Sequence, residues 1–130
     1  MFIYQQATGR LLHNEKLLAV GYSGFREGKN NPGMQGVVRV GPIPVGWYAI
    51  GETVDSPSKG PVVIRLYPHK TTRIFGRSGF LIHGDSLGNP GEASHGCIIV
   101  PRDVRKYITA SSDRQLQVVS GLEEYRAETL

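Results

Sequence analysis

The sequence has 130 residues, of which 39% are hydrophobic and 20% charged, a composition typical of a globular domain and not of a disordered chain. The net charge is +4, but the basic residues are scattered and do not alternate with aromatic residues, which argues against a nucleic-acid partner. The single cysteine excludes an internal disulfide, and no stretch reaches the roughly 18 apolar residues of a membrane span. We therefore expect one domain over residues 1–130, with an acidic tail over about 121–130 and no membrane insertion.

The first third of the chain predicts strands and one long loop. Residues 2–4 and 11–13 flank a Thr-Gly turn and predict a hairpin in which His13 is exposed, and residues 17–20 predict a further strand. The Gly- and Asn-rich residues 22–36 predict a long surface loop, and loops of this length are usually functional. Residues 37–40 then predict a short strand.

The remainder predicts further strands and one helix. Residues 47–50 and 62–67 predict two strands, and residues 79–84 predict a short buried strand that ends in polar residues. After a Gly/Pro loop, residues 101–110 predict the helix, with Val104, Tyr107 and Ile108 on one face, and residues 115–119 predict a last strand. The predicted fold class is mostly β (β-rich α+β), with one short helix after the cysteine.

Two short polar segments, His83-Gly84-Asp85 and Ser94-His95-Gly96-Cys97, suggest chemistry. A cysteine thiol has a pKa near 8.5, so a nucleophilic cysteine needs an imidazole nearby to take its proton. The loop between the two segments is long enough to place a histidine at one strand end beside a cysteine at the start of the next. We therefore predict Cys97 as nucleophile and His83 as its base.

Their neighbours are assigned supporting roles. Gly96 allows close approach of the backbone, so the amides of Gly96 and Cys97 are candidates for an oxyanion hole, and Ser94 would orient the imidazole or line the leaving-group side. Two alternatives stay open from spacing alone. The cysteine could be a buried structural residue, or His83, Asp85, His95 and Cys97 could hold a zinc ion in a non-enzymatic binding module.

Several separate motifs carry a family resemblance. Ser-His-Gly-Cys after a His, together with Gly-Pro-Ile-Pro-x-Gly-x-Tyr at residues 41–48, resembles the L,D-transpeptidases, which process peptidoglycan stems through a cysteine thioester. The chain is more closely similar to small L,D-transpeptidase-like toxins delivered by type VI secretion, over roughly residues 4–105. That similarity includes Tyr22-Ser23-Gly24, Asn30-Asn31-Pro32, Ile82-His83-Gly84-Asp85, and Gly96-Cys97-Ile98 leading to Pro101-Arg102.

The resemblance implies a single L,D-transpeptidase-like β-sandwich or sheet domain that acts on peptidoglycan tetrapeptides as an L,D-carboxypeptidase, or exchanges their terminal residue for a D-amino acid. It implies a thioester on Cys97, no metal and no cofactor. The partners expected are stem peptides, a cognate immunity protein and a component of the secretion machine, and the protein is expected to be a monomer. The start of the sequence has no signal-peptide pattern, so we expect synthesis in the cytoplasm and action in the periplasm of target bacteria.

Two departures from the wall-building enzymes affect substrate recognition. The gap between His83 and Ser94 is shorter, which implies a smaller lid, and Ile99 stands where those enzymes usually carry Arg or Asn. Recognition of a substrate carboxylate is therefore assigned to Arg77 and Arg102. The full set of substrate-binding candidates is Tyr22, Ser23, Asp85, His95, Arg77 and Arg102. A cysteine amidase or peptidase that cuts another wall bond remains an alternative.

Overall fold

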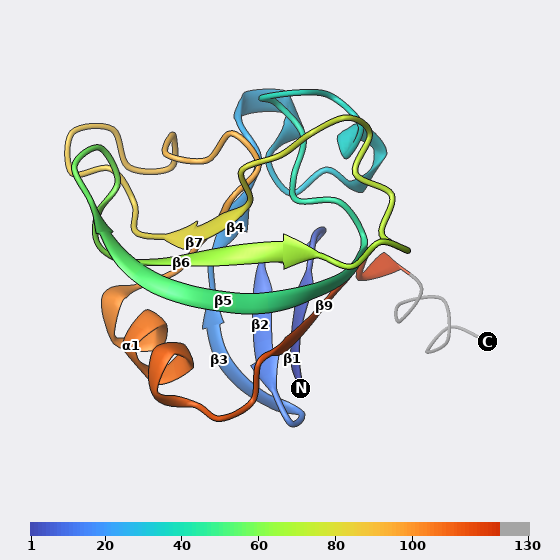
Figure 1. The fold of residues 1–130 in the computed structure, drawn as a ribbon. Coiled ribbons are helices and arrows are strands. Elements are labelled where there is room, and N and C mark those ends of the chain that lie inside the picture. The colour runs from blue at the N-terminus through green and yellow to red at the C-terminus, as the bar shows by residue number, and fades with distance from the viewer. Residues whose placement is uncertain (123–130) are drawn as a thin grey trace.

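Residues 1–122, which the computed structural model describes, form a nine-stranded sheet, one α-helix and two 3₁₀ turns (Figure 1). The elements in chain order are β1 (Phe2–Gln5), β2 (Arg10–His13), β3 (Lys16–Val20), β4 (Tyr22–Ser23), η1 (Arg26–Gly28), η2 (Pro32–Met34), β5 (Gly46–Ser56), β6 (Gly60–Pro68), β7 (Leu81–His83), β8 (Ile98–Ile99), α1 (Arg102–Ala110) and β9 (Gln115–Val119). The mostly-β prediction is confirmed. From residue 123 onward, the predicted acidic tail lies outside the described residues.

The sheet curls until it is nearly closed. The strand order is β3-β2-β1-β9-β5-β6-β7-β8-β4, so the two edge strands are β3 and β4, which are consecutive in the chain (Figure 1). Gly21 alone separates them, and a Cβ there would lie 1.9 Å from the carbonyl oxygen of Ile99. Only glycine allows this close approach, which brings the two edges of the sheet together.

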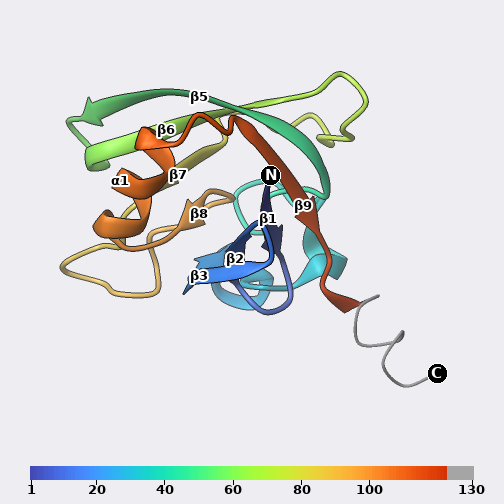
Figure 2. The same cartoon turned by 90° about the horizontal axis from the view of Figure 1, so that it is seen from below.

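One hydrophobic cluster fills the inside of the curled sheet. Alternate side chains of the strands point inward, as with Leu116 and Val118 of β9 and Phe2 and Tyr4 of β1. Helix α1 packs against β6 and β7 (Figure 2). Within residues 1–122, no helix has the length and hydropathy needed to cross a membrane.

The predicted strand at residues 37–40 is wrong. These residues form a turn in which Gly41 N–H donates to the Val37 carbonyl at 2.9 Å, and Val37 and Val38 are exposed. Arg39 has a φ of 65°, a left-handed conformation that lies outside the β region of regular strands. The valines suit a strand, but the chain reverses here and no neighbouring strand pairs with them. Within the predicted long loop, Tyr22–Ser23 instead forms the short edge strand β4.

Two smaller predictions are also corrected. His13 is mostly buried, because the β1–β2 register puts it opposite Phe2, whose ring stacks on it at 3.9 Å, and because it hydrogen-bonds Tyr107 and Asp113. On α1, Val104 and Ile108 are buried as expected, but Tyr107 is half exposed. Arg105 is buried and Tyr107 is not, because the Arg105 guanidinium donates to the main-chain oxygens of Val100, Pro61 and Val62.

Candidate active site

The pairing of β7 with β8 places His83 and Cys97 on one face of the sheet. The two strands are parallel, with Ile82 opposite Ile98 and His83 opposite Ile99. Ile82 and Ile98 point into the hydrophobic cluster. Because side chains alternate along a strand, His83 and Cys97, which directly precedes β8, both lie on the opposite face. The register therefore places the two predicted catalytic residues on the same face, at diagonal positions of neighbouring chain segments.

His83 is held in one tautomer. Its side chain is buried, and Nδ1 lies 2.8 Å from the carbonyl oxygen of Gly84, which can only accept a hydrogen bond. Nδ1 must therefore carry a hydrogen, and in the neutral ring Nε2 carries the lone pair. Nε2 is buried and has no hydrogen-bond partner in the part of the chain that the structure describes. Burial lowers the pKa of His83, and the positive charges of Lys59 and Arg105 add to this effect. The ring is thus a neutral base with a free acceptor atom.

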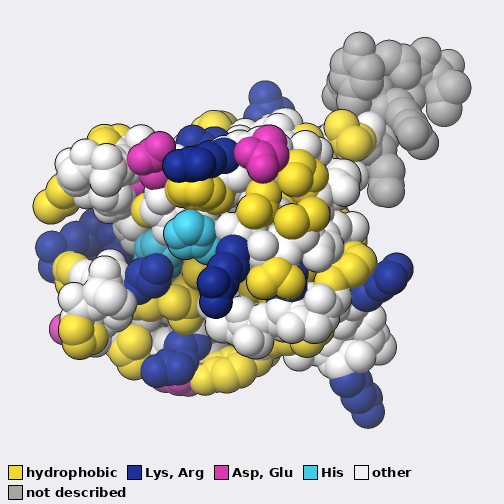
Figure 3. Space-filling model, turned by 90° about the horizontal axis from the view of Figure 1, so that it is seen from above, with side chains coloured by type: hydrophobic (Ala, Val, Ile, Leu, Met, Phe, Trp, Pro, Cys, Tyr) yellow, Lys and Arg dark blue, Asp and Glu magenta, His cyan; other side chains and the backbone are white. Residues whose placement is uncertain are grey.

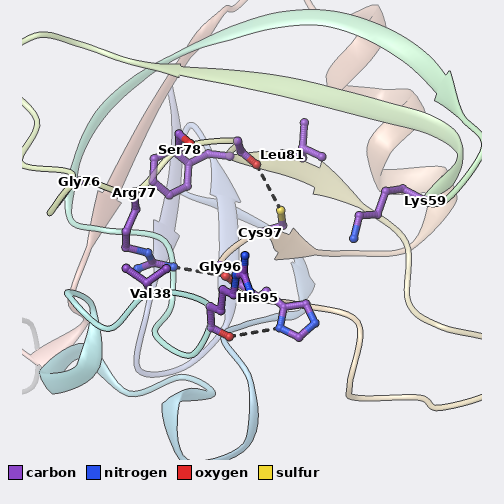
Figure 4. A pocket seen from close by; sticks show the side chains of 12 residues that line it. Val38, Lys59, Gly76, Arg77, Ser78, Leu81, His95, Gly96 and Cys97 are labelled. Carbon is purple, nitrogen blue, oxygen red and sulfur yellow. Dashed lines mark hydrogen bonds between the residues drawn. The ribbon is translucent and has the colours of Figure 1, made fainter.

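Cys97 lies at a cavity of about 350 Å³, here called the Cys97 cavity. The cavity is lined by residues 76–81, by Val38 and Arg39, by Lys59, and by residues 95–97 (Figure 4). Cys97 is half-buried and its Sγ lies 3.8 Å from the Gly79 carbonyl oxygen. Burial raises the pKa of the thiol, although the Leu81 N–H and the charges of Lys59 and Arg77 oppose that rise. At rest, therefore, the sulfur is a thiol.

Ser94 and Gly96 shape the backbone next to the cysteine and do not contact the imidazole. The buried Ser94 hydroxyl donates to the Cys97 carbonyl at 2.6 Å and accepts from the amides of Gly24 and Gly96 at 2.9 and 3.2 Å. The expectation that Ser94 orients His83 is therefore replaced by a positioning role. Since the Gly96 amide is occupied, the Cys97 amide is the remaining one of the two oxyanion-hole candidates.

Arg77 is buried, and its guanidinium is bonded to the protein's own backbone. Its Nη1 donates to the carbonyls of Gln35 and Pro42, and its Nη2 donates to those of Gly41 and His95. Four main-chain oxygens thus accept from the N–H groups that would otherwise bind a substrate carboxylate. Arg77 still brings a positive charge to the Cys97 cavity (Figure 4).

Of the other substrate-binding candidates, Ser23 is buried, and Tyr22 and Asp85 are hydrogen-bonded to each other. Ser23 is buried and accepts from the Ile43 amide, so it lies away from the cavities. The Tyr22 hydroxyl donates to Asp85 at 2.5 Å, and Asp85 also accepts from the amides of Ser86 and Gly91, which ties the loop after β7 to β4. Burial and the bond to Asp85 raise the pKa of Tyr22 to about 12.

His95 and Arg102 line a second cavity of about 730 Å³, here called the His83 cavity. It is lined by residues 57–61 and 83–87, by Glu92, Ala93 and His95, and by Arg102 and Arg105. His95 also lines the Cys97 cavity; its ring hydrogen-bonds the Arg39 carbonyl and packs on Phe25. On this side of the molecule, histidine side chains lie among Lys and Arg side chains (Figure 3).

Sequence reasoning did not single out Lys59 or Arg39. Lys59 lies in the turn between β5 and β6 and lines both cavities, with its side chain near Cys97 (Figure 4). Arg39 lies in the turn at residues 37–40 and lines the Cys97 cavity. No pattern in the sequence links either residue to the cysteine, because each reaches the site only through the fold.

The zinc alternative is not supported by the geometry. Within residues 1–122, no three His, Cys, Asp or Glu side chains lie close enough together to hold a metal ion. Of the four residues in the predicted set, Asp85 is engaged by Tyr22 and by loop amides, and His95 is directed to the Arg39 carbonyl. Within residues 1–122, the structure therefore does not assemble His83, Asp85, His95 and Cys97 into one ligand set.

The fold and site define a β-rich domain with a thiol and a neutral histidine on adjacent parallel strands. The Tlde1 domain model matches residues 18–122, and the chain therefore belongs to the Tlde1 domain family, a family of type VI secretion effectors. A comparison with curated proteins gave no match. The family match covers all of the site residues described above, and membership of the L,D-transpeptidase superfamily stays a prediction.

Proposed function

We propose that this effector is a cysteine-dependent enzyme that acts on the tetrapeptide stems of peptidoglycan, with Cys97 as nucleophile and His83 as base. One observation carries the proposal. The Nδ1–H of His83 is tied to the Gly84 carbonyl, which leaves a buried, unpartnered Nε2 on the face of the sheet that also bears Cys97. An unsatisfied buried acceptor costs about 1–3 kcal/mol, and a catalytic role is one reason for which such a group is retained.

The pKa directions define how the pair would start the reaction. Burial favours the neutral forms of both Cys97 and His83, so the resting pair is a thiol and a neutral imidazole. As the sulfur bonds to the carbonyl carbon of the third stem residue, its proton passes to His83. The amide C–N bond then breaks, and His83 gives that proton to the departing D-alanine amine. The charges of Lys59 and Arg77 favour the thiolate as it forms.

The thioester has two possible fates. Attack by water forms a C–O bond, breaks the C–S bond and returns a proton to the sulfur, which is L,D-carboxypeptidase activity. Attack by the amine of a D-amino acid forms a C–N bond, breaks the C–S bond and returns a proton to the sulfur, which is exchange. Both remove donor tetrapeptides, and we propose that this happens in the periplasm of target bacteria. In the producing cell, a cognate immunity protein would be needed.

The test is to incubate purified protein with tetrapeptide muropeptides and to weigh the products. Loss of one terminal alanine, or its replacement by an added D-amino acid, is expected with the wild-type chain and not with Cys97→Ala. Release of the whole stem peptide from the sugar would instead identify an amidase. Cleavage elsewhere in the stem would identify a peptidase of different specificity.

A further inference from the structure

The Cys97 cavity is lined by positive charge alone. Among residues 1–122, its ionisable lining side chains, apart from Cys97 itself, are Arg39, Lys59, Arg77 and His95, and none is Asp or Glu. Arg77 is bonded to four main-chain oxygens. Arg39 and Lys59 are exposed, and within residues 1–122 neither forms an ion pair. Two cations are thus available beside the thiol for an anionic ligand.

The fold places Arg39 and Lys59 at the cavity that contains Cys97. Arg39 has a left-handed φ of 65° in the turn at residues 37–40, and it lines the Cys97 cavity. The same residue accepts a hydrogen bond from His95 through its carbonyl, which fixes the turn against the segment that precedes Cys97. On the other side, the β5–β6 turn carries Lys59, and Figure 4 shows Lys59 and Arg77 on opposite sides of Cys97.

The two cavities differ in size and in charge. The His83 cavity is about 730 Å³ and contains Asp85 and Glu92 as well as Lys59, Arg102 and Arg105. A lining of both signs suits the body of a stem peptide, which carries amino and carboxylate groups. The Cys97 cavity is about 350 Å³ and only cationic, which suits a single small residue that ends in a carboxylate.

We propose that Arg39 and Lys59 form the subsite for the free terminal carboxylate of the residue that leaves the attacked carbonyl. This inference rests on the proposed function and deepens it. The subsite restricts the enzyme to chain ends, so that only a terminal residue with a free carboxylate is removed. It also accounts for carboxylate recognition in a chain that has Ile99 two residues after the cysteine and whose Arg77 is bonded to its own backbone.

The experiment compares two substrates that differ only in this carboxylate. One is a stem tetrapeptide ending in D-alanine, and the other is the same peptide ending in D-alaninamide. For the wild-type protein, kcat/KM should favour the free acid by about tenfold to a hundredfold, the range expected for one charge-assisted hydrogen bond. Lys59→Ala and Arg39→Ala should each bring this ratio towards one, mainly through KM for the acid.

The ratio is measured within each variant, so an effect of Lys59 on the reactivity of Cys97 cancels. Lys59→Arg should keep most of the preference, and Lys106→Ala, an exposed lysine on α1 away from the cavities described here, should keep all of it. A wild-type ratio near one, or a wild-type ratio retained in both Lys59→Ala and Arg39→Ala, would overturn the subsite. If wild-type protein cleaves neither peptide, the proposed function itself fails, and the subsite with it.

Discussion

Replacement of Ser94 by alanine tests whether one buried hydroxyl holds the cysteine segment in place. The substitution removes the acceptor for the amides of Gly24 and Gly96 and the donor to the Cys97 carbonyl, three bonds of 2.6–3.2 Å around a fully buried oxygen. Each buried group left without a partner costs about 1–3 kcal/mol. Three such groups give at least about 3 kcal/mol, a large part of the roughly 5–15 kcal/mol that stabilises a small domain.

The free energy of unfolding should be measured by urea denaturation for wild type, Ser94→Ala and a control, Ser112→Ala. With a slope of about 2 kcal/mol per molar urea, Ser94→Ala should lower the midpoint by about 1.5 M. Ser112 is exposed, and its replacement should change stability by no more than about 0.5 kcal/mol. Turnover by the folded Ser94→Ala protein should fall as well, because the Cys97 backbone is no longer held. A midpoint and a turnover both equal to wild type would refute the reasoning.

Four further results are expected. Cys97→Ala and His83→Ala should abolish turnover with little change in circular dichroism. The acid limb of kcat/KM should lie below pH 6.5, because burial lowers the pKa of His83 and activity is lost as the ring gains a proton. A limb above pH 6.5 would contradict this. Gly96→Ala should lower the melting temperature far more than Gly88→Ala, since Gly96 has a φ of 128° and a Cβ there would lie 2.2 Å from Arg77, whereas Gly88 faces open space. Expression in the cytoplasm should be nearly harmless, while the same chain with a secretory signal should lyse or round cells unless Cys97 is replaced; equal toxicity from both compartments would exclude the wall as target.

The sequence alone predicts much of the sheet because its strands have strong local signals. Residues 62–67 are a run rich in β-branched residues bounded by turn residues, and they lie within β6. The sequence also predicts a histidine at the end of one strand and a cysteine just before another, and β7 and β8 have this arrangement. Residues 37–40 show where such signals fail, because valines favour a strand only where a partner strand is available, and here the chain turns.

The role of each basic residue around the thiol depends on contacts that are distant in sequence. Arg77 and Arg39 are both isolated arginines near glycines, and nothing local separates them. Tertiary structure buries Arg77 against carbonyls 35 to 42 residues away and leaves Arg39 exposed at the cavity. Lys59 likewise reaches the cavities that contain Cys97 and His83 only through the packing of the β5–β6 turn. Local pattern determines which residues can react, because it reflects strand ends and backbone freedom. The fold decides which charges face these residues, because charges meet only where distant segments pack together.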